Sequence, residues 1–124
     1  MFIEVIEHLD DDALAEVLAV LRQLVTPDGL ILITTPNDEN LPKSHVFCPE
    51  TGKVFHRWQH VRSWTADSLT AHLTDHGLLP VRVEAVKLKS KPMVRLRNKI
   101  RKMRGSRKSK HFPNLTGVFR LSDS

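Results

Sequence analysis

The feature that most constrains this chain is the run at residues 30–35, where leucine and β-branched residues follow one another without apolar–polar alternation. Such a run predicts a strand buried on both faces, which is typical of a parallel sheet. The preceding residues predict a helix that would cover it. Aspartates at residues 10–12 suit a helix start, because aspartate caps the first turn and complements the helix dipole. Apolar residues then recur at three- and four-residue spacing up to Val25.

The rest of the chain continues this alternation of helices and strands. Thr65 suits the start of a second helix and Gly77 its end, whereas residues 38–63 predict an irregular loop rich in polar and aromatic side chains. We therefore expect one α/β domain over residues 1–124, with its last two strands paired antiparallel. The remaining predicted elements are a strand end within residues 2–9, a helix at 66–76, strands at about 79–88 and 115–121, and a third helix from residue 90 to about 103.

The charge of the chain is strongly asymmetric. Residues 1–50 carry ten acidic and two basic side chains, whereas residues 87–124 carry thirteen basic and one acidic. Twelve of the basic side chains lie in residues 87–110, which contain no aromatic residue. We predict that these residues belong to a basic insertion at about 87–112. This composition suits contact with RNA or another polyanion, or with an anionic membrane surface, and a solvated loop has it too.

Several classes of protein are excluded or disfavoured at once. No apolar run approaches the roughly 18 residues that a membrane-spanning helix needs, so we expect no transmembrane segment. Residues 1–8 contain two glutamates and no basic residue, which is unlike a secretory signal. Cys48 is the sole cysteine, which excludes a disulfide framework and a four-cysteine zinc site. These features together predict a cytoplasmic protein.

Residues that bear chemistry concentrate beyond the two predicted strands, where open α/β sheets bind their ligands. Glu4, Glu7 and His8 are spaced so that a helical turn would point all three to one side. Carboxylates and an imidazole are good ligands for a divalent ion, although Glu7 and His8 would serve equally to cap or solvate the following helix. The loop adds His56 and His60, whose imidazoles suit a base or a ligand, or simple surface hydrogen bonding.

Residues 2–12, Phe-Ile-Glu-Val-Ile-Glu-His-Leu-Asp-Asp-Asp, resemble the segment after the fourth strand of class I S-adenosylmethionine-dependent methyltransferases. Residues 26–29 and 30–37 continue the match as that family's turn and fifth strand, with Asp28 where glycine is usual. The resemblance covers residues 2–88 and extends to 115–121. It implies a partial Rossmann-like methyltransferase fold: a mostly parallel sheet with an antiparallel C-terminal strand pair, lacking the N-terminal cofactor-binding half.

The same resemblance implies methyl transfer from S-adenosylmethionine to an unidentified acceptor. In the family, the residues matching Phe2, Ile3 and Glu4 lie beside the cofactor, so these are the expected cofactor-binding residues. His8, His60 and His56 are the candidate catalytic bases. The family's glycine-rich loop lies upstream of the matching part, and this sequence holds no Gly-x-Gly pair. We therefore expect this chain to bind S-adenosylmethionine weakly or not at all by itself.

The order Glu4-x-x-Glu7-His8, followed by His60, also resembles small-RNA 2′-O-methyltransferases, which hold a divalent ion on two glutamates and two histidines. This implies metal ligands at those four positions and a Lewis-acid ion that activates a ribose hydroxyl. Mixed carboxylate and imidazole ligands suit Mn²⁺, Co²⁺ or Zn²⁺ better than Mg²⁺. Ser63 stands where that family usually has an acidic residue. RNA methylation is therefore an alternative, beside an inactive remnant or a nucleic-acid-binding module.

The resemblance also predicts self-association. In the intact family, the strand ending near residue 6 is central, with the family's first strand on one side and residues 30–35 on the other. The first strand has no counterpart in the matching part, and an open apolar edge is a template for pairing with another chain. We expect a homodimer or larger homo-oligomer with residues 1–9 at or near the contact.

Overall fold

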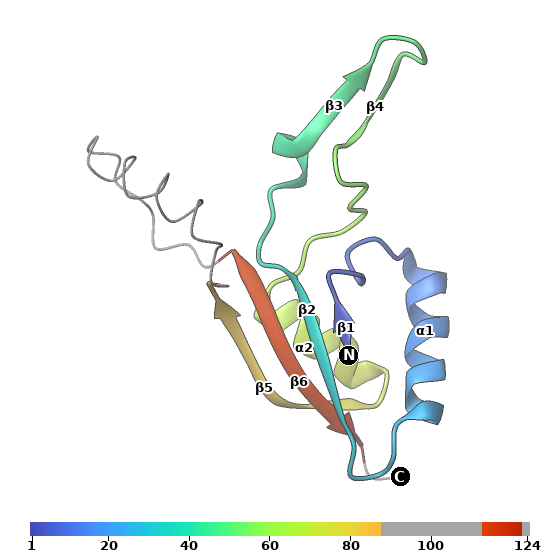
Figure 1. Cartoon of the computed structure of the whole chain (residues 1–124), viewed down its shortest axis with the longest axis vertical. Coiled ribbons are helices and arrows are strands. Elements are labelled where there is room, and N and C mark those ends of the chain that lie inside the picture. Colours follow the sequence, from blue (N-terminus) through green and yellow to red (C-terminus); the bar gives the residue numbers. More distant parts are fainter. Residues whose placement is uncertain (88–112, 123–124) are drawn as a thin grey trace, which may run out of the picture.

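The computed structural model describes residues 1–87 and 113–122. Within them the chain forms a small α/β fold with a mixed four-stranded sheet and a separate hairpin (Figure 1). The predicted helix from residue 90 and nearly all of the basic insertion lie outside the described residues. The elements are β1 (Phe2–Ile3), α1 (Asp11–Leu24), β2 (Leu30–Pro36), a 3₁₀ helix (Leu41–Ser44), β3 (His45–Cys48), β4 (Lys53–His56), α2 (Ala66–Asp75), β5 (Leu78–Val86) and β6 (Asn114–Leu121).

Both predicted helices of the described part are confirmed, with the expected caps. The Asp10 carboxylate accepts a hydrogen bond from the backbone N–H of Ala13 at 2.9 Å, which caps α1. Thr65 caps α2 in a capping box with Ser68, in which each side chain accepts from the other residue's backbone N–H. Local chemistry alone fixes both starts, because these side chains satisfy N–H groups that a helix end leaves unpaired.

The sheet has the strand order β1-β2-β6-β5. β1 pairs with β2 in parallel, and β6 pairs antiparallel with β2 on one side and with β5 on the other. The predicted antiparallel pairing of the last two strands is confirmed. The sheet as a whole is mixed: β1, β2 and β5 run in one direction, and β6 runs between β2 and β5 and opposite to both, so the predicted sheet is confirmed in part. An uninterrupted apolar run indicates burial of a strand but not the direction of its neighbours.

The predicted strand end within residues 2–9 is confirmed only for Phe2–Ile3. Ile3 is 49% exposed, and full burial begins at Ile6 and Glu7, in the turn that follows the strand. The strand ends at Glu4, whose φ of 52° lies in the left-handed region. β1 is therefore a short edge strand that delivers the turn at residues 4–8 to the end of the sheet.

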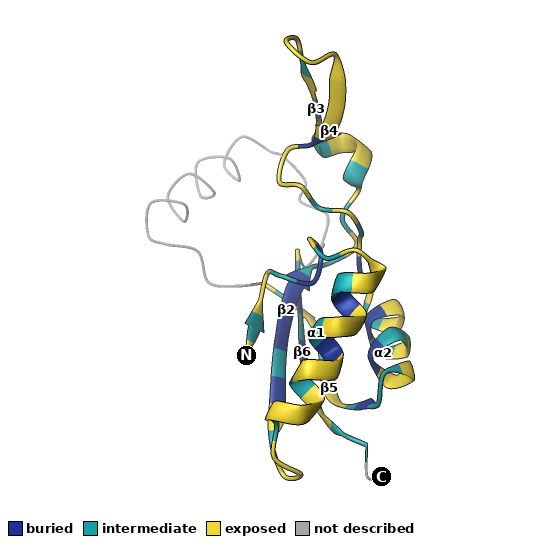
Figure 2. Cartoon of the chain, turned by 90° about the vertical axis from the view of Figure 1, so that its right-hand side faces the viewer, coloured by how far each residue is buried: buried dark blue, intermediate teal, exposed yellow. Residues whose placement is uncertain are grey.

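The core lies on one face of the sheet, under α1 and α2 (Figure 2). β6 contributes Phe119, whose ring passes so close to Gly117 that a Cβ there would lie 2.4 Å from it. Neither α1 nor α2 is long and apolar enough to cross a membrane. The buried apolar residues of this core are Ile6, Leu14, Leu18, Ile31, Ile33, Trp64, Leu69, Leu73, Leu78, Leu115 and Phe119.

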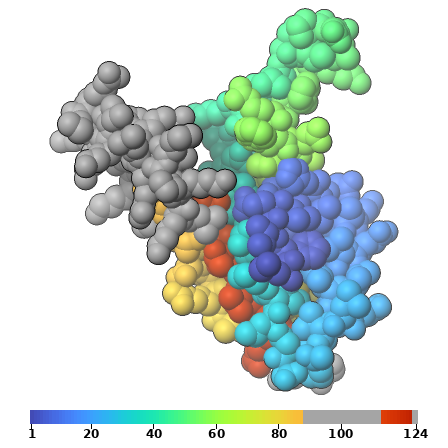
Figure 3. Space-filling model, in the orientation of Figure 1, coloured from blue at the N-terminus to red at the C-terminus, as the bar shows by residue number. Residues whose placement is uncertain are grey.

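The irregular loop predicted for residues 38–63 contains a hairpin, so that prediction is wrong for β3 and β4. The two strands pair antiparallel from His45–His56 to Cys48–Lys53. Gly52, with a φ of 66°, completes the connecting turn in a conformation that glycine adopts without strain. The hairpin projects from the rest of the molecule (Figure 3). After β4 the chain returns to the end of the sheet, where the N–H of Val61 donates to the carbonyl of Glu7.

Candidate functional site

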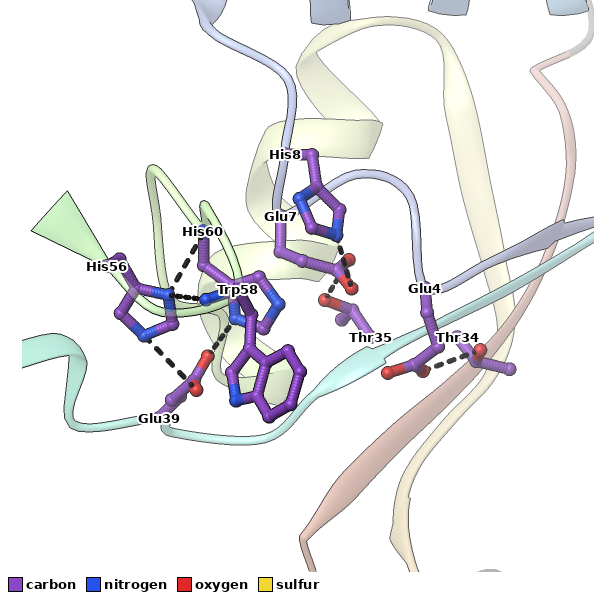
Figure 4. Close-up of polar contacts among 9 residues, drawn as sticks. All are labelled: Glu4, Glu7, His8, Thr34, Thr35, Glu39, His56, Trp58 and His60. Atoms are coloured by element: carbon purple, nitrogen blue, oxygen red, sulfur yellow. Dashed lines mark hydrogen bonds and ion pairs between the residues drawn. The ribbon is translucent and has the colours of Figure 1, made fainter. Parts of the chain in front are cut away.

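The candidate site lies where the parallel strands β1 and β2 end. Three segments meet there: residues 4–8 after β1, residues 38–39 after β2, and residues 56–60 at the end of β4 and beyond it (Figure 4). Backbone hydrogen bonds tie them together, because the N–H of Val61 donates to the carbonyl of Glu7 at 2.9 Å and the N–H of Asp38 to the carbonyl of Trp64 at 2.8 Å. The site is therefore held by backbone contacts between segments far apart in the sequence.

Glu7 is the buried carboxylate of the site, with 1% of its surface exposed. Its Oε2 accepts a hydrogen bond from the Thr35 hydroxyl at 2.9 Å, whereas its Oε1 has no hydrogen-bond partner among the described residues. A buried carboxylate oxygen without a donor is costly, because burial removes the water that would otherwise solvate its charge. Glu7 is thus suited to bind a cation through Oε1.

His8 and His60 lie around that oxygen. The His8 Nε2 is 3.9 Å from Glu7 Oε1, and the rings of His8 and His60 meet edge to face with centroids 4.8 Å apart. One ligand atom from each of Glu7, His8 and His60 lies within 4.8 Å of the other two. Ligands about 2.0–2.2 Å from a shared ion lie at most about 4.4 Å apart. Three ligands at tetrahedral angles around one ion lie about 3.4 Å apart, so binding an ion would draw these atoms together by up to about 1.4 Å.

Glu4, the fourth predicted ligand, lies outside this group. Its Oε1 accepts a hydrogen bond from the Thr34 hydroxyl at 2.9 Å. Burial raises the pKa of Glu4, the Thr34 hydrogen bond opposes this, and the neighbouring charge of Glu7 adds to it. The structure thus brings together three of the four predicted ligands, whereas the fourth, Glu4, is hydrogen-bonded to Thr34 of β2.

A second group, Glu39, His56 and His60, shares one histidine with the first. The two Glu39 oxygens face the two rings: Oε2 forms a hydrogen bond with His60 Nδ1, and Oε1 lies 3.5 Å from His56 Nε2. Sequence reasoning did not select Glu39. Its signal was its position directly after the buried strand β2, on the edge where ligands bind.

His56 is 5% exposed, and its Nδ1 accepts hydrogen bonds from the backbone N–H groups of Trp58 at 3.3 Å and His60 at 3.2 Å. Burial lowers the pKa of His56, while the charge of Glu39 opposes that shift. With Nδ1 occupied and the ring buried, His56 is poorly placed to take a proton from a substrate. Of the three predicted bases, His8 and His60 belong to the group formed with Glu7.

Backbone strain also concentrates at this site. Among the described residues, positive φ outside glycine occurs at Glu4, Asp38 and Gln59, with values of 52°, 47° and 60°. Asp38 directly precedes Glu39, and Gln59 directly precedes His60. Such conformations cost about 1–3 kcal/mol each and persist where surrounding contacts impose them, which is frequent at functional sites.

The predicted cofactor residues lie on β1 and directly after it. Phe2 is half-buried against the core, and Ile3 and Glu4 are more exposed. The described residues include no glycine-rich loop, so they do not form a complete site for S-adenosylmethionine. Comparisons with protein-family models, curated proteins and solved structures found no match.

Proposed function

We propose that this chain is the metal-holding, acceptor-binding part of an S-adenosylmethionine-dependent methyltransferase that acts on a hydroxyl group. The observation that carries the proposal is the convergence of Glu7, His8 and His60 on the unpartnered Glu7 oxygen. The fold supports it, because the resemblance expects the first strand segment beside residues 30–35 and an antiparallel pair at the end.

The donor set fits a divalent ion. One carboxylate and two imidazoles favour Mn²⁺, Co²⁺ or Zn²⁺ over Mg²⁺. An ion bound there supplies Lewis acidity to an acceptor hydroxyl. Glu7 supplies the charge, Thr35 orients its carboxylate from β2, and His8 and His60 supply the nitrogens. The chain's own part in the reaction is to hold the acceptor oxygen at a fixed place, which is what methyl transfer requires.

S-adenosylmethionine does not fit the described residues as a complete site. Phe2, Ile3 and Glu4 offer one accessible edge, without a loop to cradle the methionine part. We expect titration calorimetry to show weak binding or none for this chain alone. Micromolar affinity would contradict this part of the proposal.

RNA is the second candidate acceptor class. Trp58 is 60% exposed and belongs to the segment that carries His56 and His60 (Figure 4), so a planar base could stack on its ring. The twelve basic side chains of residues 87–110 suit contact with a phosphate backbone. A metal-bound vicinal diol and a stacked base together describe the terminal nucleoside of an RNA strand.

Metal binding tests the proposal first. We expect the wild-type chain to bind Mn²⁺ in electron paramagnetic resonance titrations, and Glu7→Gln to weaken binding at least about tenfold, because it removes the only charged ligand of the group. Glu16→Gln, an exposed carboxylate on α1, is the matched control and should bind as the wild type does. Absence of Mn²⁺, Co²⁺ and Zn²⁺ binding, or equal binding by Glu7→Gln, would contradict the proposal.

The acceptor is tested with nucleosides. In nuclear magnetic resonance titrations of the Zn²⁺-loaded chain, we expect adenosine to shift the amide signals of residues 4–8 and 56–60. We expect 2′-deoxyadenosine and 3′-deoxyadenosine to lose most of this effect, because each lacks one hydroxyl of the diol. Equal shifts with and without metal would exclude a metal-bound hydroxyl.

A further inference from the structure

The contacts of Glu39 carry a conclusion about where the protons of the neighbouring histidines lie. We infer that Glu39 is a positioning residue: it holds the proton of neutral His60 on Nδ1 and so keeps Nε2 of that ring unprotonated for the group around Glu7. His56 faces the other oxygen of Glu39. The role in metal binding rests on the proposed function. The assignment of the protons rests only on the contacts in the ion-free chain.

The proton count at His60 follows from its partner. A carboxylate only accepts hydrogen bonds, so the His60 nitrogen that meets Glu39 Oε2, which is Nδ1, must donate. A neutral imidazole carries one N–H, which leaves the lone pair on Nε2. In Figure 4 this second nitrogen of His60 lies on the side of Glu7, away from Glu39. The ring is therefore presented with its free lone pair toward the unpartnered Glu7 oxygen.

The proton count at His56 is the opposite. Its Nδ1 accepts from the backbone N–H groups of Trp58 and His60, so Nδ1 holds a lone pair and the proton of the neutral ring is on Nε2. That N–H is buried and lies 3.5 Å from Glu39 Oε1, longer than a hydrogen bond but close enough for attraction. A metal on Nε2 would require the proton on Nδ1, which already accepts from two backbone N–H groups, so Glu39, His56 and His60 are poorly arranged as a second ion site.

The two assignments give Glu39 a defined role. One of its oxygens is held toward His56 and the other fixes His60, as the carboxylate does in carboxylate–histidine–metal arrangements. Glu39 side-chain exposure is 20%, so the contact is partly shielded from water. Without Glu39, His60 would lose the acceptor that keeps its proton on Nδ1. The neutral ring would then exist as a mixture of the Nδ1–H and Nε2–H tautomers.

Nitrogen-15 spectra of the histidine side chains test this in the metal-free chain at a pH where the rings are neutral. We expect the wild type to show the Nδ1–H form for His60 and the Nε2–H form for His56. In Glu39→Ala, His60 should shift toward Nε2–H, the form that free histidine prefers. Glu39→Gln should largely restore Nδ1–H, because its amide oxygen accepts the same hydrogen bond.

Two further variants test whether the effect depends on the location of Glu39 or on a general disturbance of the fold. Glu50→Ala removes an exposed carboxylate from the hairpin turn and should leave both rings as in the wild type. His56→Asn keeps an acceptor near the position of Nδ1, so it preserves the turn to His60, but it removes the group that faces Glu39. We expect His60 in this variant to show a mixture of both forms.

The metal-loaded chain gives the second readout. Glu39→Ala should weaken Mn²⁺ binding about 10- to 100-fold, as loss of such an outer carboxylate does elsewhere. The inference is overturned if wild-type His60 carries its proton on Nε2, or if Glu39→Ala leaves the His60 form unchanged. A wild type with the expected ring forms that binds no divalent ion would support the proton assignment and remove the proposed function, so the two failures are distinguishable.

Discussion

At the scale of single residues, the buried carboxylate of Glu7 depends on one hydroxyl. We expect Thr35→Val to destabilise the fold by about 1–3 kcal/mol, because it leaves both oxygens of a buried carboxylate without a donor. Thr74→Val, the same change at an exposed position of α2, should alter stability far less. Urea unfolding monitored by circular dichroism measures both. Equal effects in the two variants would show that the Thr35 hydroxyl contributes nothing to Glu7.

His72 gives the fold a pH dependence away from the candidate site. Burial lowers its pKa, and the charges of His76 and Arg62 lower it further. Because the unfolded chain binds this proton more readily, the stability that neutral His72 provides is present above its ordinary pKa near 6.5 and is lost as pH falls below it. The buried His72 Nε2 has no described hydrogen-bond partner that would offset this.

We therefore expect the wild type to lose more stability between pH 7.5 and pH 5.5 than His72→Gln does in urea unfolding. His56, whose pKa is also lowered by burial, keeps part of the slope in that variant. A His72→Gln slope as steep as that of the wild type would contradict the prediction.

At the scale of elements, Gly117 sets how closely β6 packs. A methyl group there would overlap the buried ring of Phe119, so we expect Gly117→Ala to cost about 1–3 kcal/mol of global stability. In Gly52→Ala the added Cβ meets open space, but the residue must keep a positive φ. We therefore expect backbone strain in the hairpin only. Thermal unfolding reports the first and amide signals of residues 45–56 the second. A melting temperature unchanged in Gly117→Ala would contradict the packing argument.

The elements predicted correctly from the sequence are those that are determined by neighbouring residues in the chain. α1 follows from the cap at Asp10 and one apolar face, and β2 from an unbroken apolar run. The hairpin gave no such pattern, since Phe47 and Val54 are each 63% exposed and mark no buried face. Glu39 was missed for a related reason: its role arises only when the hairpin returns the chain to His56 and His60, and no spacing encodes that return.

At the scale of the whole molecule, the outer edge of β1 has no partner strand among the described residues. We expect light scattering at low micromolar concentration to give a homodimer or larger, because exposed strand edges pair with one another. Ile3→Glu, at this edge, should shift the equilibrium to monomer, whereas Val20→Glu on the exposed side of α1 should not. A wild-type mass near 14.2 kDa would show the prediction wrong.

The place of β6 in the sheet has a consequence for how the protein is made. β6 comes last among the described strands in the sequence, yet it lies between β2 and β5 and joins them. A ribosome therefore releases both neighbours before the strand that connects them, and until then each exposes an unpaired edge. Sheets closed by such distant pairings form slowly. Nascent chains that expose such edges are the ones that chaperones protect from aggregation.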